Sequence, residues 1–346
     1  MIIYFVLFFI PLFFYVFLNI DKEKKQKICF LSFFILFFIL LIFKDESVGV
    51  DTKFYISTFN SMKNISWDNI FKLKSSEYGF YGFTYLCSKI FSSSQSYFFI
   101  IYCFILIITY IYYKKNSEDS IITILYILGI DTFCLLFSGI RQSIAISLCM
   151  LASFFLYEKN LKNFFRFLII VFVATMFHES SLIFFFAYPL SMIRLRKKTV
   201  PFIFVSYGII FALRTKILTF VMPYLPLKYQ LYNYGAGGAY RMILLMILII
   251  MLLFIFDRNM EDKKYYIWRN MVVLSGFIFI FSNIHFLAAR FSYYYIIFLP
   301  LCMQKLFIKN SNNIVVKAII ICLGLIMFVN QMVSDPLEII PYKFMF

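Results

Sequence analysis

Residues 120–157 read SIITILYILGIDTFCLLFSGIRQSIAISLCMLASFFLY, and this stretch decides the class of fold. It is almost twice as long as the roughly 20 apolar residues that cross a bilayer as one helix. We therefore expect two membrane-crossing helices, residues 120–138 and 141–157, joined by a turn at residues 138–142. Arg141 stands at the start of the second helix, where an ionisable group is costly unless it serves a cavity or a partner.

The whole chain has the composition of an all-α, polytopic integral membrane protein. Of its 346 residues, 63% are hydrophobic, and the mean hydropathy is +0.87. No soluble domain of this size needs so much apolar surface. The net charge is +16, and the basic residues cluster in short loops, as is expected from the positive-inside rule and from contact with anionic lipid. The charge therefore does not indicate a nucleic-acid partner.

Apolar segments predict about twelve spans in a single transmembrane domain over residues 1–346. The predicted spans are residues 2–19, 28–43, 96–113, 120–138, 141–157, 163–177, 180–193, 199–213, 241–256, 265–282, 288–308 and 314–332. Another segment, residues 78–93, is expected not to cross and to form a re-entrant or interfacial helix.

Loop charge orients these spans. Lysines and arginines gather in six connecting loops, at residues 21–27, 114–115, 159–166, 194–198, 258–264 and 305–309. Because basic loops stay in the cytoplasm, twelve spans would place all six loops inside and both termini outside. The outward-facing segments are then the first long outer loop (44–95), the second outer loop (214–240) and the turns at 138–142, 178–181 and 285–290.

Two arginines on that outer side are candidates for binding an anion. Arg141 and Arg290 each open a predicted span, and a guanidinium offers a planar fork of donors that suits phosphate, so that two of them could clamp a diphosphate. The alternative is an interfacial arginine that extends to lipid headgroups. Arg241 follows a glycine-rich segment, residues 232–238, that is typical of a mobile outer loop.

Acidic and histidine side chains near the same turns are candidates for proton transfer. His178 and Glu179 lie at the tip of a predicted hairpin, where either could take a proton from a hydroxyl group or orient the group that does. Alternatively, Glu179 only caps the next helix. Asp51 and Thr52 resemble a helix N-cap, although the carboxylate could also meet a hydroxyl group or an arginine. Glu77 precedes an aromatic run that is typical either of a carbohydrate-contacting edge or of an interfacial belt.

The remaining motifs give no sign of a metal or a cofactor. The seven cysteines show no CxxC or other ligand spacing, and two histidines make a histidine-based metal site improbable. The first apolar run lacks a basic start and a small-residue cleavage site, so we expect it to remain as a span.

In this arrangement the chain resembles the EpsG-like branch of the Wzy polysaccharide polymerases, from about residue 40 to residue 300. The resemblance is carried by short motifs whose order and spacing match: Gly49-Val-Asp51-Thr52 with Tyr55 and Phe59, Glu77 with Gly79, Gly139-Ile-Arg141-Gln142 with Ala145, Phe177-His178-Glu-Ser180, and Arg290 with Tyr294 and Pro300. Lys44 stands where the family often has an arginine.

The resemblance implies an outer-face glycosyltransferase of the bacterial inner (plasma) membrane. Its substrates would be undecaprenyl-pyrophosphate-linked oligosaccharides, which it would join into an O-antigen, capsule or exopolysaccharide. The site would then lie on the periplasmic or extracellular face. Membrane lipid would be a further partner, and the resemblance leaves room for a chain-length regulator protein.

The resemblance also implies a role for individual residues in this reaction. Arg141 and Arg290 would bind the pyrophosphate, and His178, Asp51 and Glu77 would be candidates for the base. Further substrate contacts are expected from Gln142, Thr52, Tyr55, Glu179 and Arg241.

Three other functions remain as alternatives. A lipid-linked oligosaccharide flippase or other transporter would need polar groups on both sides of an inner cavity, often in repeated halves. An O-antigen ligase would share the chemistry but attach finished polymer to lipid A. A polytopic sugar acyltransferase would leave chain length unchanged.

Overall fold

Helices make up all the regular structure that the computed structural model describes, which is every residue except 71–76, 225–239, 258–261 and 336. For residues 286 and 287 only the backbone is described. The α-helices are α1 (Ile2–Phe17), α2 (Lys22–Ile42), α3 (Thr52–Met62), α4 (Trp67–Ile70), α5 (Tyr78–Ile90), α6 (Ser94–Asn116), α7 (Ser120–Gly129), α8 (Asp131–Ser138), α9 (Ile140–Ser153), α10 (Leu161–Phe177), α11 (Ala187–Leu190), α12 (Val200–Val221), α14 (Tyr240–Ile255), α15 (Lys263–Phe279), α16 (Phe286–Ile296), α17 (Leu299–Lys309) and α18 (Ile314–Ser334). Short 3-10 helices complete the described structure: η1 (Phe154–Leu156), η2 (Glu179–Phe186), η3 (Lys197–Thr199), η4 (Met222–Tyr224) and η5 (Ile280–Asn283). The prediction of an all-α membrane protein is thereby confirmed.

The number of membrane spans is smaller when it is counted by helix length. Within the described residues, five helices are long and apolar enough to cross a membrane, or seven if two bent pairs each count as one span. The helices α1, α10 and α14 have 16 or 17 residues, which at about 1.5 Å per residue fall short of a bilayer core of about 30 Å. The prediction of twelve spans is therefore not confirmed by this count.

The predicted apolar segments are nevertheless helical. Segment 120–138 forms α7 and α8, which meet at an angle of 64°, and segment 288–308 forms a pair with a 45° bend. Segment 180–193 is mostly the 3-10 helix η2 followed by α11. In segment 214–240, predicted as the second outer loop, α12 continues to Val221, so residues 214–221 are helical, and residues 225–239 lie outside the described part.

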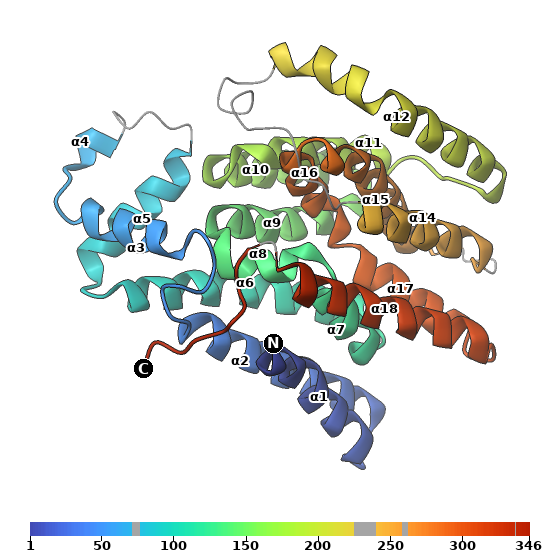
Figure 1. The fold of residues 1–346 in the computed structure, drawn as a ribbon, viewed down its shortest axis with the longest axis horizontal. Helices are drawn as coiled ribbons and strands as arrows, with labels where there is room; N and C mark the ends of the chain where they lie inside the picture. The colour runs from blue at the N-terminus through green and yellow to red at the C-terminus, as the bar shows by residue number, and fades with distance from the viewer. Residues whose placement is uncertain (71–76, 225–239, 258–261, 336) are drawn as a thin grey trace.

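The core lies around α7, α9, α15 and α17, since most of their residues are buried. The helices α1, α2 and α18 cover one flank, and α12 runs along the opposite edge of the bundle (Figure 1). Only 11% of the apolar window in Lys197–Tyr224 is buried. Among the five described helices that are long and apolar enough to cross a membrane, this one is therefore the least buried.

The described residues of the six basic loops lie at one end of the bundle, which we call the basic end. Lys305 contacts Glu118 at 2.5 Å and Asp262 at 3.2 Å, and Gln26 accepts a hydrogen bond from the backbone of Ser120. Further contacts join the remaining loops: Asn310 to Phe256, Lys159 to Ser191, and Tyr157 to Trp268. These loops lie together although they are spread over almost 300 positions of sequence.

The described residues of segment 44–95, predicted as the first outer loop, fold at the other end of the bundle, which we call the motif end. They form α3, α4 and α5, at the left in Figure 1, close to the C-terminal tail. The tail pairs with residues 43–50: the amides of Gly49 and Asp45 donate to the carbonyls of Glu338 and Lys343 at 3.0 and 2.9 Å. The 13-residue helix α5 matches the predicted helix at 78–93.

Candidate active site at the motif end

Glu77, Arg141 and His178 are in direct contact, although they lie 64 and 101 positions apart along the chain. Glu77 Oε2 accepts a hydrogen bond from Arg141 Nη1 at 2.5 Å, and Glu77 Oε1 lies 2.6 Å from His178 Nδ1. The Glu77 side chain is 6% exposed, His178 17% and Arg141 28%. The carboxylate is thus buried between two partners that both remain reachable from outside.

Aromatic rings enclose the arginine of this cluster. The guanidinium carbon of Arg141 lies 5.5 Å from the ring centre of Phe54 and 5.7 Å from that of Phe80. Phe80 packs in turn against Tyr55, with ring centres 5.7 Å apart. Cations over aromatic faces are stabilised by the ring quadrupole, so these rings hold the guanidinium in place and limit its access to water.

The same burial affects the ionisation of Glu77. Burial by itself raises the pKa of this carboxyl group, but the hydrogen bond and charge of His178, together with Arg141, outweigh it, so the pKa lies below its ordinary value. Glu77 is therefore an anion at neutral pH. It is suited to orient His178 and to compensate one positive charge.

Local sequence explains how the three side chains meet. Glu77 is the residue before α5, and His178 separates α10 from η2. A Cβ atom on Gly79 would lie 2.8 Å from Met176 Cβ, a distance that real side chains do not adopt. Glycine at this position therefore lets the start of α5 approach the end of α10 closely enough for Glu77 to reach His178.

The predicted Asp51-Thr52 motif supports the start of α9 from the other side. The amide of Asp51 donates to Ser138 Oγ at 3.1 Å, and a Cβ atom on Gly49 (φ +89°) would lie 2.3 Å from the carbonyl oxygen of Phe137. Only glycine adopts this backbone conformation freely and permits so close an approach. The motif is thus fastened to the turn just before Arg141.

Lys44 completes that junction. Its ammonium group is buried, donates to Thr52 Oγ1 at 2.8 Å and to the carbonyl of Val48 at 3.3 Å, and also donates to the carbonyl of Phe137. Burial lowers the pKa of Lys44 to about 7, and the charge of Asp51 offsets part of that shift. This lysine therefore binds the protein's own oxygen atoms, and its position gives it a structural role in holding the motif.

Arg290 reaches the junction through its backbone. Gln142 Nε2 donates to the carbonyl oxygen of Arg290 at 2.7 Å, and Ser180 Oγ lies 2.9 Å from Tyr294 Oη on the same helix, α16. The Arg290 side chain is partly exposed. These two contacts bind α16 to α9 and η2, so the predicted positions 142, 180, 290 and 294 belong to one assembly.

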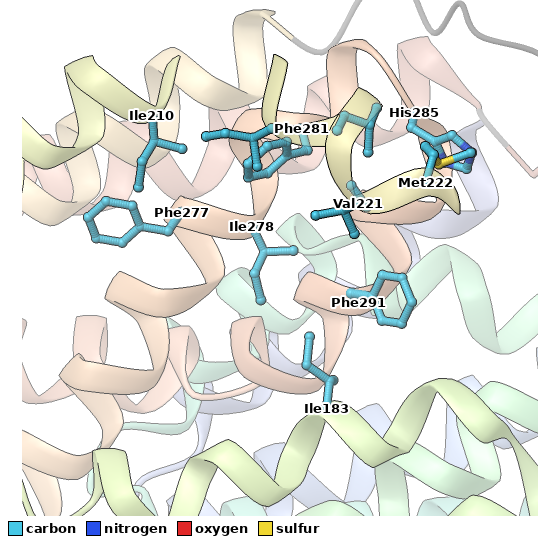
Figure 2. A pocket seen from close by; sticks show the side chains of 12 residues that line it. Ile183, Ile210, Val221, Met222, Phe277, Ile278, Phe281, His285 and Phe291 are labelled. Atoms are coloured by element: carbon cyan, nitrogen blue, oxygen red, sulfur yellow. The ribbon is translucent and has the colours of Figure 1, made fainter. Parts of the chain in front are cut away.

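An apolar cavity of about 420 Å³ lies beside this assembly (Figure 2). One wall comes from α12 and η4, another from α15, η5 and α16, and Ile183 of η2 reaches it from below. We call it the α12 groove; its lining includes Ile210, Val221, Ile278, Phe281 and Phe291. Ile183 lies five residues after His178, and Phe291 comes directly after Arg290. The groove therefore adjoins two of the predicted site segments.

Not every predicted residue joins the cluster. Arg241 is exposed at the start of α14, and Glu179 is partly buried beside His178; the described contacts connect neither to Glu77. No group of three or more metal-ligating side chains occurs within the part of the chain that the structure describes.

Several contributors went unrecognised in the sequence. Phe54 was not singled out, the aromatic run that begins at Phe80 was expected to contact carbohydrate or the membrane interface rather than an arginine, and Ser138 was assigned only to a turn. The C-terminal tail had no motif at all. The one sequence signal was Gly79, two residues after Glu77, because a glycine at that position allows a close contact between helices beside the carboxylate.

A comparison with protein families gives one match. The sequence profile of the EpsG family aligns with residues 27–344, nearly the whole chain, and so includes each of the motif-end residues described above. No curated protein and no solved structure matches the chain.

Proposed function

Because the chain belongs to the EpsG family, we propose that it is a membrane glycosyltransferase that polymerises polyprenyl-diphosphate-linked oligosaccharides into a surface polysaccharide. The family suggests a polymerase-like role. The observation that supports the reaction is the contact of one buried carboxylate with both an arginine and a histidine. Such a trio supplies a positive group for a leaving diphosphate and an oriented base for an attacking hydroxyl.

In the proposed reaction His178 is the base. When Nδ1–H donates to Glu77, Nε2 is left with a lone pair that accepts a proton. The acceptor hydroxyl gives its proton to Nε2 while its oxygen forms a bond to the anomeric carbon of the donor sugar. The bond from that carbon to the diphosphate oxygen breaks, and the lipid diphosphate leaves with the electron pair. Glu77 is then a positioning residue, because it acts through His178.

Arg141 and Arg290 stabilise the departing diphosphate in this scheme. One donor of Arg141 is used by Glu77, but a guanidinium has five N–H donors, and the Arg141 side chain remains 28% exposed. In a poorly solvated site, preorganised donors of this kind contribute a few kcal/mol to the transition state. Gln142, Thr52, Tyr55 and Asp51 hold these groups in place.

The α12 groove offers a path for the polyprenyl tail. Its lining is almost wholly apolar and adjoins the segments of His178 and Arg290. Its volume of about 420 Å³ lies within the roughly 300–1,000 Å³ of ordinary ligand pockets, so it would hold the first part of a long tail. The remainder would lie in lipid along α12. In this proposal the protein lies in the bacterial plasma membrane, and its motif end faces outward.

The test is a ladder gel of surface glycans from a deletion strain complemented with variants. Arg141→Ala and His178→Ala should each lower the amount of long-chain polymer roughly a hundredfold or more, leave single repeat units, and keep normal protein levels in the membrane. Lys53→Ala, a neighbouring exposed cation that pairs at the surface with Glu46, is the matched control. Normal chain lengths in Arg141→Ala would contradict the proposal.

The same strains separate the alternatives. Free polymer that is not attached to lipid A after deletion would indicate a ligase. Accumulation of lipid-linked units in the inner leaflet would indicate a flippase. Unchanged chain lengths with loss of a sugar ester would indicate an acyltransferase.

A further inference from the structure

A polar pocket, separate from the apolar α12 groove, lies at the basic end, far from the motif end. It has a volume of about 260 Å³ between the loop that precedes α12 and the start of α15. Its polar lining consists of Arg194, Arg196, Lys197, Asp257, Tyr266 and Arg269. We call it the basic pocket. Nothing in the proposed reaction uses it.

A buried arginine forms the floor of the basic pocket. Arg269 is 1% exposed, pairs with Asp257, and donates to the carbonyl of Leu195 at 2.5 Å. Its guanidinium also lies 4.2 Å from the ring centre of Phe254. A charge buried this deeply is costly unless it is paired and held by several contacts, so this arginine is an integral part of the fold.

The next residue fixes the loop that forms the rim. Asn270 Nδ2 donates to the carbonyls of Leu190 and Ile193, at 3.0 and 2.7 Å. On the rim, Arg194 lies over the ring of Tyr266 at 4.6 Å and donates to its hydroxyl group at 2.9 Å. The loop is therefore preorganised, and its cationic side chains are placed around the pocket before any ligand binds.

The charges of the lining favour an anion. Four of the described lining residues are cationic and one is a carboxylate. Asp257 is engaged by Arg269, so the positive charge of the rim exceeds the negative charge available inside the pocket. In addition, Arg269 Nε is a buried donor without a hydrogen-bond partner in the described structure.

The position of the pocket identifies the source of that anion. Lys197 begins the helical segment that continues directly into α12, and α12 exposes large apolar side chains such as Phe202 and Val205. A phospholipid whose phosphate occupied the pocket could lay its acyl chains along this surface. We propose that the basic pocket binds the headgroup of an anionic phospholipid of the leaflet at the basic end.

The experiment measures lipid binding to the purified full-length protein in detergent. Native mass spectrometry and thermal-unfolding assays would compare phosphatidylglycerol with phosphatidylcholine. We expect phosphatidylglycerol to be retained and to raise the midpoint of unfolding in a saturable manner, and phosphatidylcholine to do neither. In the double variant Arg196→Gln/Lys197→Gln, affinity for phosphatidylglycerol should fall about thirty-fold, which corresponds to about 1 kcal/mol for each basic residue.

The matched control is Lys22→Gln/Lys27→Gln, which removes the same two charges from exposed positions of the basic end outside the pocket. It should keep the affinity of the unmodified protein. An equal loss in both double variants would overturn the proposal, because binding would then follow only the overall surface charge. Equal binding of the two lipids would also overturn it, as would inorganic phosphate that replaces phosphatidylglycerol at similar concentration.

Discussion

Glu77 is a carboxylate with a histidine on one oxygen, an arginine on the other and almost no contact with water. The sequence predicted each of the three residues separately, because each interrupts an apolar or aromatic run. It did not predict that one carboxylate is shared, since that depends on three helix ends meeting in space. Asp51 was expected as an alternative base, but its described contact is a backbone hydrogen bond to Ser138, which fits support of the turn.

The ionisation of Glu77 predicts how stability depends on pH. Its folded-state pKa is depressed, so the carboxylate stabilises the fold at pH above the unfolded-state value of about 4.3. This contribution is lost as pH falls through the folded-state pKa. The midpoint of thermal unfolding should therefore drop between about pH 5 and about pH 3, and the drop should be smaller in Glu77→Gln.

Glu46→Gln is the control for that measurement. Glu46 is exposed and lies 3.9 Å from Lys53, and such surface pairs contribute little to stability. This variant should follow the pH profile of the unmodified protein. A Glu77→Gln profile that coincides with it would show that the buried carboxylate does not contribute in this range.

At the scale of elements, the packing of α5 against α10 decides whether the cluster forms. The sequence predicted a helix near residues 78–93 and a break at His178, because apolar runs and polar turns mark both. It could not predict that residues 180–186 are a 3-10 helix, nor that α12 continues to Val221. Both features depend on tertiary contacts, which local propensity does not register.

Gly79→Ala tests this packing. The added methyl group would lie 2.8 Å from Met176 Cβ and 3.0 Å from the backbone of the same residue, so α5 must move away and Glu77 must leave His178. We expect a loss of about 1–3 kcal/mol in the free energy of unfolding, the usual effect of overpacking. Long-chain polymer should fall by more than stability alone explains, as measured on ladder gels at matched protein level.

Gly82→Ala on the same helix provides the comparison. No atom outside the adjoining residues and the backbone of its own helix lies within 4 Å of the added Cβ, and alanine favours a helix over glycine by about 0.5–1 kcal/mol. This variant should be at least as stable as the unmodified protein and fully active. If both variants behaved alike, the close approach at Gly79 would not be what holds the cluster together.

At the scale of the whole molecule, the two ends of the bundle differ in kind. The basic loops meet at one end, and the family motifs meet at the other with both termini. Tyr4 near the N-terminus donates to the carbonyl of Ile339 in the tail at 2.6 Å. A bilayer that separates the two ends would therefore be crossed an even number of times, whereas the described helices that are long and apolar enough to cross number five, or up to seven. Charge pattern in the sequence predicted this grouping of loops, although it does not by itself give the number of spans.

Cysteine labelling tests which end faces outward. Lys53→Cys lies on α3 at the motif end and Lys198→Cys at the basic end, and both positions are exposed. In a background in which the exposed Cys322 is serine, a membrane-impermeant maleimide added to intact cells should label position 53. Position 198 should react only after the membrane is permeabilised, because basic loops are retained in the cytoplasm. The reverse pattern would place Glu77, Arg141 and His178 in the cytoplasm and exclude an outward-facing polymerase, whereas labelling of both positions from outside would mean that no bilayer separates the two ends.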